Sequence, residues 1–148
     1  MDSIRLIFAF IYIVVDLVYV TYSRPVYDSV VTRIQGSPMK LSGSADYMAV
    51  LGAYACMALG WYFIAAEMVN LLIADKASPS WTNISKLPAV VIGGLVGFVY
   101  GIATIGMFNL TTRAMFKQYD WKIVGRDMAW GIGWQTILCA MYAVALKM

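Results

Sequence analysis

Hydrophobic residues dominate four long stretches of the chain, at about residues 4–22, 47–72, 87–110 and 127–146, and charged residues lie mainly between them. Each stretch is long enough to cross a bilayer, because about 20 apolar residues span its hydrocarbon core. We predict helices, since a backbone amide inside hydrocarbon must find its partner within the segment and the alternating pattern of a membrane barrel is absent. The pattern predicts an all-α, four-helix membrane bundle that forms a single integral membrane domain over residues 1–148.

The boundaries of these segments carry recognisable signals. Pro88 suits the first turn of the third helix, and Asp127 is placed to cap the fourth, because an aspartate side chain accepts hydrogen bonds from free backbone N–H groups. The loop at 75–86 is polar and irregular. The loop before the fourth helix is short and basic, and its Tyr119 and Trp121 are expected to anchor it at the membrane interface.

The stretch between the first and second apolar segments is itself patterned. From Arg24 to Gln35, apolar residues recur at every fourth position, as Val26, Val30 and Ile34. This spacing predicts a short amphipathic helix between the first two spans, ended by Gly36. The helix would either lie on the membrane surface or dock on the end of the bundle.

Composition restricts the function. The 148 residues are 61% hydrophobic and only 13% charged, whereas a soluble domain carries roughly a quarter charged residues. This excludes an ordinary soluble enzyme and a nucleic-acid-binding module. The chain also lacks histidine, the usual imidazole base and metal ligand, and we identify no nucleophile. We therefore expect no enzymatic activity, no metal and no cofactor.

The distribution of cations predicts the topology. With four spans, the first and third loops share one side, and the termini share the other with the second loop. The first side holds seven of the eleven cations, which are Arg24, Arg33, Lys40, Arg113, Lys117, Lys122 and Arg126; the other holds Arg5, Lys76, Lys86 and Lys147. Because cytoplasmic loops carry the excess of lysine and arginine, both termini are predicted on the non-cytosolic side.

Small residues recur at every fourth position in two of the segments. They are Gly52, Cys56 and Gly60 in the second, and Gly93, Gly97 and Gly101 in the third. Such stripes let helix backbones approach closely, which drives packing inside a membrane. A glycine-lined substrate path is the functional alternative, and we favour packing.

Several polar residues are expected at similar depth near the basic loops. The candidate cluster comprises Asp16, Asn109, Arg113, Arg126, Asp127 and Trp130. An ionisable group within a span costs at least about 2.5 kcal/mol, so Asp16 needs a partner, and we predict one among Asn109, Arg113, Arg126 and Trp130. The cluster is either a tie between helices or a polar pocket that binds a head group or passes protons. Glu67 is expected near the opposite leaflet, with Arg5 at similar depth.

The third and fourth segments resemble a known family of small membrane proteins. The resemblance rests on Tyr100-Gly101, Phe108-Asn109-Leu110-Thr111-Thr112, Trp121 and Asp127-Met128-Ala129-Trp130-Gly131. These strings are similar to the hallmark of domain-of-unknown-function family 2177, which occurs in bacteria and large DNA viruses, and Asp16 matches the acidic residue of that family's first helix. The resemblance spans nearly the whole chain and implies four membrane helices.

The chain departs from the family pattern at Asn109, where relatives commonly carry an aspartate. An amide cannot exchange a proton near neutral pH, so chemistry that needed paired acids would be lost here. The residues Met1-Asp2-Ser3-Ile4-Arg5 and the turn at 33–38 resemble the viral branch more than the bacterial one.

These observations favour a non-enzymatic structural protein that crosses the membrane several times. Under the viral resemblance it would lie in the internal membrane of a virus particle and contact capsid or membrane neighbours through its basic loops. The alternative is a small-molecule or lipid-handling protein, either a transporter or an accessory to a lipid-modifying enzyme, that uses a pocket around Asp16. An ion channel would need oligomers, because four tightly packed helices leave no pore.

Overall fold

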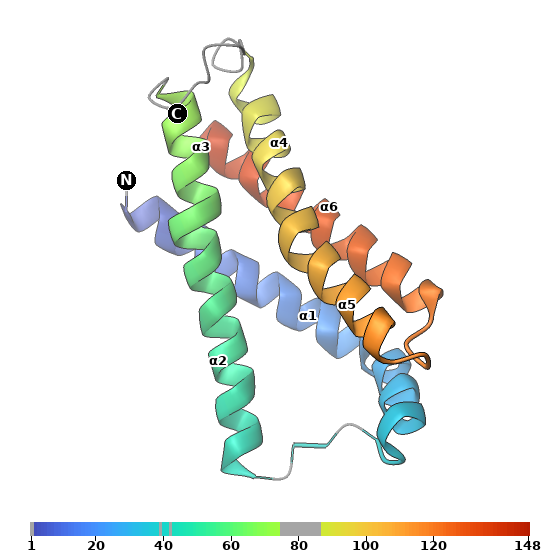
Figure 1. The fold of residues 1–148 in the computed structure, drawn as a ribbon. Coiled ribbons are helices and arrows are strands. Elements are labelled where there is room, and N and C mark those ends of the chain that lie inside the picture. The colour runs from blue at the N-terminus through green and yellow to red at the C-terminus, as the bar shows by residue number, and fades with distance from the viewer. Residues whose placement is uncertain (1, 39, 42, 75–86) are drawn as a thin grey trace.

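The protein is an all-α membrane protein with four long apolar helical segments (Figure 1). The structure, a computed structural model, describes residues 2–38, 40–41, 43–74 and 87–148. Within these ranges no strand is present, and the candidate spans are Ser3–Gln35, Ser44–Ile73, Ala89–Met115 and Trp121–Ala145. The predicted four-helix membrane architecture is therefore confirmed. The predicted loop at 75–86 lies outside the described residues.

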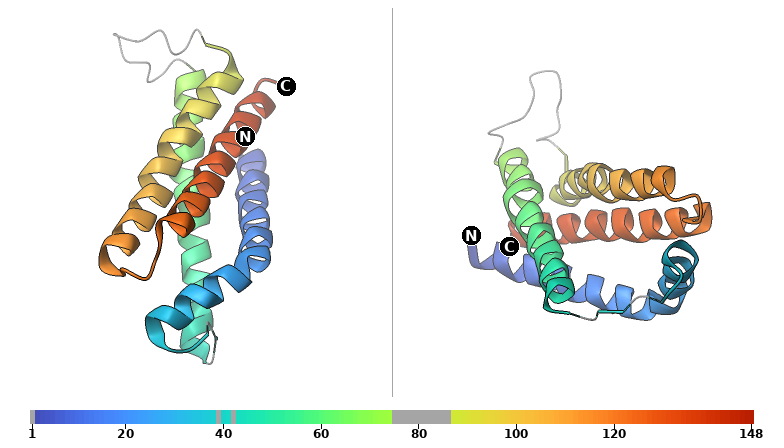
Figure 2. Two further views of the ribbon diagram at one scale, coloured as in Figure 1. Left: turned by 90° about the vertical axis from the view of Figure 1, so that its right-hand side faces the viewer. Right: turned by 60° about the horizontal axis from the view of Figure 1, so that its bottom comes forward.

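Two of the spans contain a π-helical turn, which is wider than a turn of an α-helix. In chain order the elements are α1 (Asp2–Gln35), α2 (Ser44–Gly60), η1 (Trp61–Ala65), α3 (Ala66–Ile73), α4 (Ala89–Gly101), η3 (Ile102–Gly106), α5 (Met107–Met115) and α6 (Trp121–Ala145). The π-helical turns η1 and η3 continue their neighbours without a break, so each of these series forms one long helix. Both termini lie toward the same end of the bundle (Figure 2), as four spans require.

The predicted amphipathic helix between the first two spans is not a separate element. It is the last part of α1, which contains Pro25 and ends at Gln35. Figure 2 shows this part turned sharply away from the rest of α1, because proline removes one helical hydrogen bond and bends a helix without necessarily ending it. Gly36 stops the helix with a φ of 79°, a backbone conformation that glycine adopts readily. Val30 is buried against Ile123 and Val124 of α6, so this part docks on the bundle.

The fourth helix begins earlier than predicted, and a different aspartate caps it. The helix starts at Trp121, and its N-cap is Asp120, whose carboxylate accepts hydrogen bonds from the backbone N–H groups of Lys122 (2.9 Å) and Ile123 (3.1 Å). The bond from Ile123 is the main reason that the pKa of Asp120 lies below its usual value. Asp127 lies inside the helix, so its predicted role as a cap is wrong. The extended backbone that an N-cap needs occurs at Asp120 instead.

The main core lies where α1, η1 and α6 meet. Phe8, Trp61 and Tyr142 are buried there and form a triangle of aromatic contacts, with ring centroids 5.4 to 6.2 Å apart. Offset and edge-to-face aromatic pairs of this kind add to the packing that burial already provides. The first and fourth spans and the η1 turn inside the second are therefore held together at this level.

The closest helix contact is between α4 and α6, and the glycines of the third span lie on it. A Cβ atom at Gly93 would overlap the backbone carbonyl of Cys139, and one at Gly97 would overlap that of Gln135. At Gly101, a Cβ atom would lie 2.9 Å from the Cα atom of Ile132. Figure 2 shows the two helices running side by side in opposite directions.

The second span differs, because its first half stands apart from the bundle. No residue of α2 is buried, and the helix diverges from α1 toward its own start (Figure 1). Among the described residues, a Cβ atom at Gly52 would have no neighbour within 4 Å, whereas one at Gly60 would lie 2.6 Å from the hydroxyl of Tyr100. Cys56 is exposed. The predicted packing stripe on this segment is therefore wrong at Gly52 and Cys56, because both residues are exposed on α2, whereas Met57 of the same helix packs against the core.

Candidate functional site

The centre of the polar region is Asp127, which α6 holds among tyrosines of other segments. The residue is 9% exposed. Its Oδ1 accepts hydrogen bonds from the hydroxyls of Tyr19 (2.9 Å) and Tyr27, and its Oδ2 accepts one from Tyr119 (2.8 Å). Tyr19 and Tyr27 flank the bend of α1 at Pro25, so the bent helix approaches one carboxylate from two directions.

Asn109 of α5 completes this group. Its Nδ2 donates to the backbone carbonyl of Ile105 (3.0 Å), and its Oδ1 lies 2.7 Å from the Tyr119 hydroxyl. A phenol has a single hydrogen, so Tyr119 shares it between the amide and the carboxylate. Burial and the adjacent Asp127 raise the pKa of Tyr119 above its usual value, which keeps the phenol protonated.

We refer to Tyr19, Tyr27, Asn109, Tyr119 and Asp127 as the tyrosine–aspartate cluster. Its members come from α1, α5, α6 and the residues 116–120 that join α5 to α6. Because Asn109, Tyr119 and Asp127 are buried, their polar atoms depend on one another for hydrogen bonds. Satisfied buried networks of this kind fix the arrangement of the elements that contribute to them.

The two arginines predicted for the site lie beside the cluster and not in it. Arg126 donates to the hydroxyl of Ser23 (2.9 Å), and its guanidinium stacks 5.7 Å from the centre of the Tyr19 ring. Arg113 is partly buried and lies 5.6 Å from the centre of the Trp121 ring. Trp130 stacks on Tyr19 with ring centroids 4.5 Å apart, so it packs against the wall of the cluster.

Asp16 is separate from the cluster. Its carboxylate faces the hydroxyl of Tyr54 and the indole of Trp130. The Trp130 Nε1 atom is buried and makes no hydrogen bond of normal geometry within the described residues. The structure therefore gives Asp16 a neighbour from the predicted set, Trp130, but places Asn109 and the arginines in other contacts.

Asp16 also lines a cavity between α1 and α2. The cavity has a volume of about 620 Å³, and its walls include Leu17 and Arg24 from α1 and Val50 and Tyr54 from α2. It forms where the first half of α2 diverges from α1. The walls are mostly apolar, as in typical small-molecule and lipid sites.

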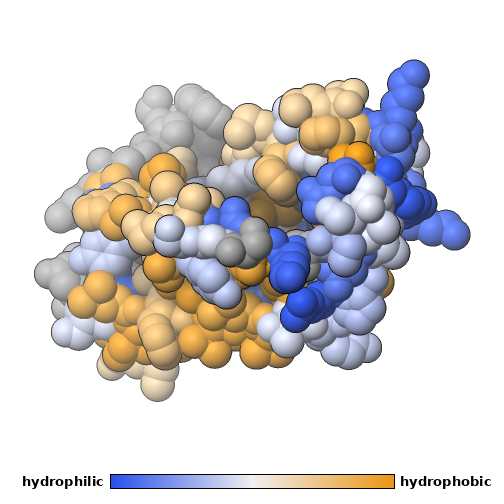
Figure 3. All heavy atoms as spheres, turned by 90° about the horizontal axis from the view of Figure 1, so that it is seen from below, coloured by the Kyte–Doolittle hydropathy of each residue, from blue (hydrophilic) through white to orange (hydrophobic). Residues whose placement is uncertain are grey.

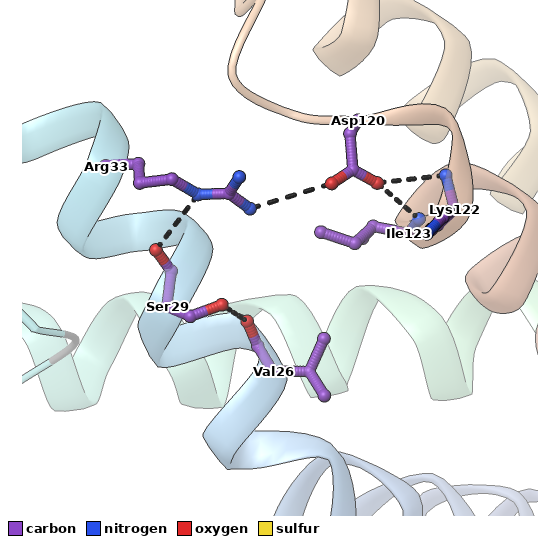
Figure 4. A network of polar contacts seen from close by, with 6 residues as sticks. All are labelled: Val26, Ser29, Arg33, Asp120, Lys122 and Ile123. Carbon is purple, nitrogen blue, oxygen red and sulfur yellow. Dashed lines mark hydrogen bonds and ion pairs between the residues drawn. The ribbon is translucent and has the colours of Figure 1, made fainter.

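Outside the buried cluster, an ion pair also joins α1 to the start of α6. Arg33 of α1 points toward Asp120 at the start of α6 (Figure 4), with Nη2 and Oδ2 3.6 Å apart. The Nε atom of Arg33 also donates to the carbonyl of Ser29 (3.3 Å). Because both side chains are about half exposed, the pair contributes little to stability. It lies at the edge of the contact between α1 and α6 that the buried cluster maintains.

A second polar group lies at the opposite end of the bundle, where Arg5 and Glu67 form an ion pair. Next to it, the side-chain amide of Asn70 lies between Arg5 and the Tyr142 hydroxyl: its Nδ2 donates to that hydroxyl (3.0 Å), and its Oδ1 accepts from the Arg5 guanidinium. The similar depth expected for Arg5 and Glu67 is therefore realised as a direct contact between α1 and α3. At this end too, the charged side chains join two spans.

Sequence reasoning missed three members of the cluster, the tyrosines Tyr19, Tyr27 and Tyr119. Tyr119 was expected at the membrane interface and is instead 6% exposed, and Tyr27 was assigned to the short amphipathic helix without a polar partner. In the described part of the chain, no three residues of the cysteine, aspartate or glutamate type lie close enough to hold a metal ion. Comparison with protein-family models, with curated proteins and with solved structures finds no match to this chain.

Proposed function

We propose that the protein is a non-enzymatic, structural component of a membrane. The observation that supports this most strongly is the use of Asp127, whose carboxylate accepts hydrogen bonds from three tyrosines of other segments. A catalytic acid or base must reach a substrate, whereas this carboxylate is enclosed by the side chains that it ties together. The pairing of Arg5 with Glu67 follows the same principle at the other end.

The partners we propose are capsid or membrane proteins that bind the basic end of the molecule. Arg33, Lys117 and Lys122 are exposed there, and Figure 3 shows hydrophilic residues gathered toward one side of this end, beside a largely hydrophobic surface. A cationic face attracts an acidic partner surface and steers its approach. The placement in the internal membrane of a virus particle rests on the resemblance to family 2177 alone.

Chemical cross-linking tests this proposal. An amine-reactive cross-linker applied to the native membrane is expected to join Lys117 and Lys122 to a discrete protein neighbour in a fixed ratio, and Lys117→Gln/Lys122→Gln is expected to abolish that product. The matched control is Lys147→Gln, which removes a cation from the opposite end and should leave the product intact. A ladder of products without a fixed ratio would contradict a structural partner.

The topology is a separate prediction. We expect cysteines at Ser37 and Gln118 to react with a membrane-impermeant maleimide from the cytosolic side, and a cysteine at Lys147 from the other side. The reason is that seven of the eleven cations flank the first and third loops. Labelling of Ser37 and Gln118 from opposite sides would contradict the arrangement, and labelling of all three in the reverse sense would invert it.

One observation favours a second candidate function, in which the protein handles a lipid or small molecule. This is the cavity of about 620 Å³ between α1 and α2, with Asp16 on its wall. A structural helix pair is normally packed along its length, whereas these two helices leave a space large enough for a ligand.

A further inference from the structure

We propose that the cavity between α1 and α2 binds an anionic phospholipid, with its phosphate on Arg24 and Lys40 and an acyl chain between the two helices. This inference deepens the second candidate function and rests on it. It assigns the ligand class from three features of the cavity, which are its shape, the charges along it and the character of its walls.

The cavity lies in the wedge between α1 and α2, which diverge toward the start of α2 (Figure 1). Asp16 and Arg24 both line it and are eight positions apart, which corresponds to about 12 Å along a helix. Arg24 lies beside the end where α2 begins, and Asp16 lies deeper, where Tyr54 approaches from α2. A ligand that enters between the helices therefore meets the cations first.

The charges along the wedge favour an anion at its mouth. Among the described residues that line it, Arg24 and Lys40 are the cations and Asp16 is the acid. The Arg24 side chain is 64% exposed, and its closest ion pair, with Asp28 on the same helix, is long at 3.7 Å. The guanidinium is therefore accessible to a phosphate, for which arginine is a preferred partner.

The walls between the mouth and Asp16 suit an acyl chain. Leu17 and Val20 line the cavity from α1, and Val50 and Met57 line it from α2. A free phosphate would leave these side chains without a partner, whereas a phospholipid fills the wedge and continues into the bilayer.

The test is native mass spectrometry of the full chain, released from detergent micelles that contain either phosphatidylglycerol or phosphatidylcholine. The protein is expected to retain phosphatidylglycerol more strongly, by about fivefold for each cation that contacts the phosphate. Arg24→Gln/Lys40→Gln should remove the preference. Lys117→Gln/Lys122→Gln makes the same change of charge at the α5–α6 corner and should leave it unchanged.

A steric variant tests the position of the chain. Ala53 lines the cavity, so Ala53→Trp should lower retention of both lipids, while Gly52→Trp, at a position with nothing within 4 Å, should not. Asp16→Asn should preserve the preference for phosphatidylglycerol. Size-exclusion elution identifies any variant that does not fold.

The outcomes separate the two levels of the proposal. Equal retention of both lipids, or the same loss in the Arg24/Lys40 and Lys117/Lys122 variants, overturns the assignment of an anionic phospholipid. Loss of binding in Asp16→Asn together with full binding in Arg24→Gln/Lys40→Gln also overturns it, but it supports a ligand held by the acid. Unchanged retention in Ala53→Trp overturns the ligand cavity altogether.

Discussion

Replacing Gly97 with alanine is expected to lower the free energy of unfolding by about 1–3 kcal/mol, the usual cost of overpacking a closely packed contact. The added Cβ atom would overlap the backbone carbonyl of Gln135 on α6. Because a backbone carbonyl cannot rotate away as a side chain can, α4 and α6 must separate along their closest contact. The measurement is the thermal unfolding of the purified protein in detergent.

Two other glycines provide matched controls for the same substitution. At Gly94, a Cβ atom would lie 3.8 Å from the Cγ2 atom of Thr136, an ordinary contact, and at Gly133 it would meet nothing within 4 Å. Gly133→Ala should raise stability, since alanine is better than glycine inside a helix by roughly 1 kcal/mol. Similar effects of all three substitutions would show that the α4–α6 contact is not as close as described.

Replacing Asp127 with alanine is expected to cost about 3 kcal/mol, because hydrogen bonds to a charged group contribute more than neutral ones and their losses are not additive. The substitution removes the acceptor of Tyr19, Tyr27 and Tyr119. Tyr119 suffers most, since it is buried and retains only the amide oxygen of Asn109. Equilibrium unfolding in mixed micelles measures the change.

Variants that remove one tyrosine hydroxyl at a time show how much of this loss of stability each hydrogen bond accounts for. Tyr27→Phe and Tyr119→Phe should each give a fraction of the loss, and each should have a smaller effect when Asp127 is already alanine. Tyr22→Phe is the control, because Tyr22 lies on the same helix and is 81% exposed. An Asp127→Ala protein as stable as the Tyr22→Phe protein would contradict the role assigned to the cluster.

The four spans could be predicted from the sequence because their apolar length leaves no other structure possible inside a bilayer. The connection after the first span was harder. Arg24 to Gln35 was interpreted as a separate short helix, whereas it is the last part of α1, which contains Pro25 and continues to Gln35. Sequence alone does not separate these outcomes, because the docking of Val30 on α6 is a tertiary contact.

The depth of the candidate-site residues in the membrane could be predicted from the sequence, but the rotation of each helix about its axis could not. Antiparallel spans place Asn109, Asp127 and Trp130 near one end of the first helix, and the structure brings them there. Which acid faces the others depends on how each helix is rotated about its axis, and depth does not determine that angle. The misplaced cap has a different cause. Asp120 and Asp127 are both suitable N-cap residues, and the hydropathy of the sequence rises only after Asp127.

The central claim is that the tyrosine–aspartate cluster ties the bent end of α1 to the start of α6. The distance between spin labels on these two elements, measured by electron paramagnetic resonance in liposomes, tests it most directly. Suitable positions for the labels are Thr32 and Lys122, both exposed. The background is Cys56→Ser, and Cys139 can stay because it is 0% exposed, so we expect no label there.

A single narrow distance distribution is expected for the protein with its cluster intact, and a broad one that extends to longer distances is expected for Asp127→Ala. The Tyr22→Phe protein should keep the narrow distribution. An Asp127→Ala protein with the same narrow distribution would show that the end of α1 is held by other contacts, which would contradict the account.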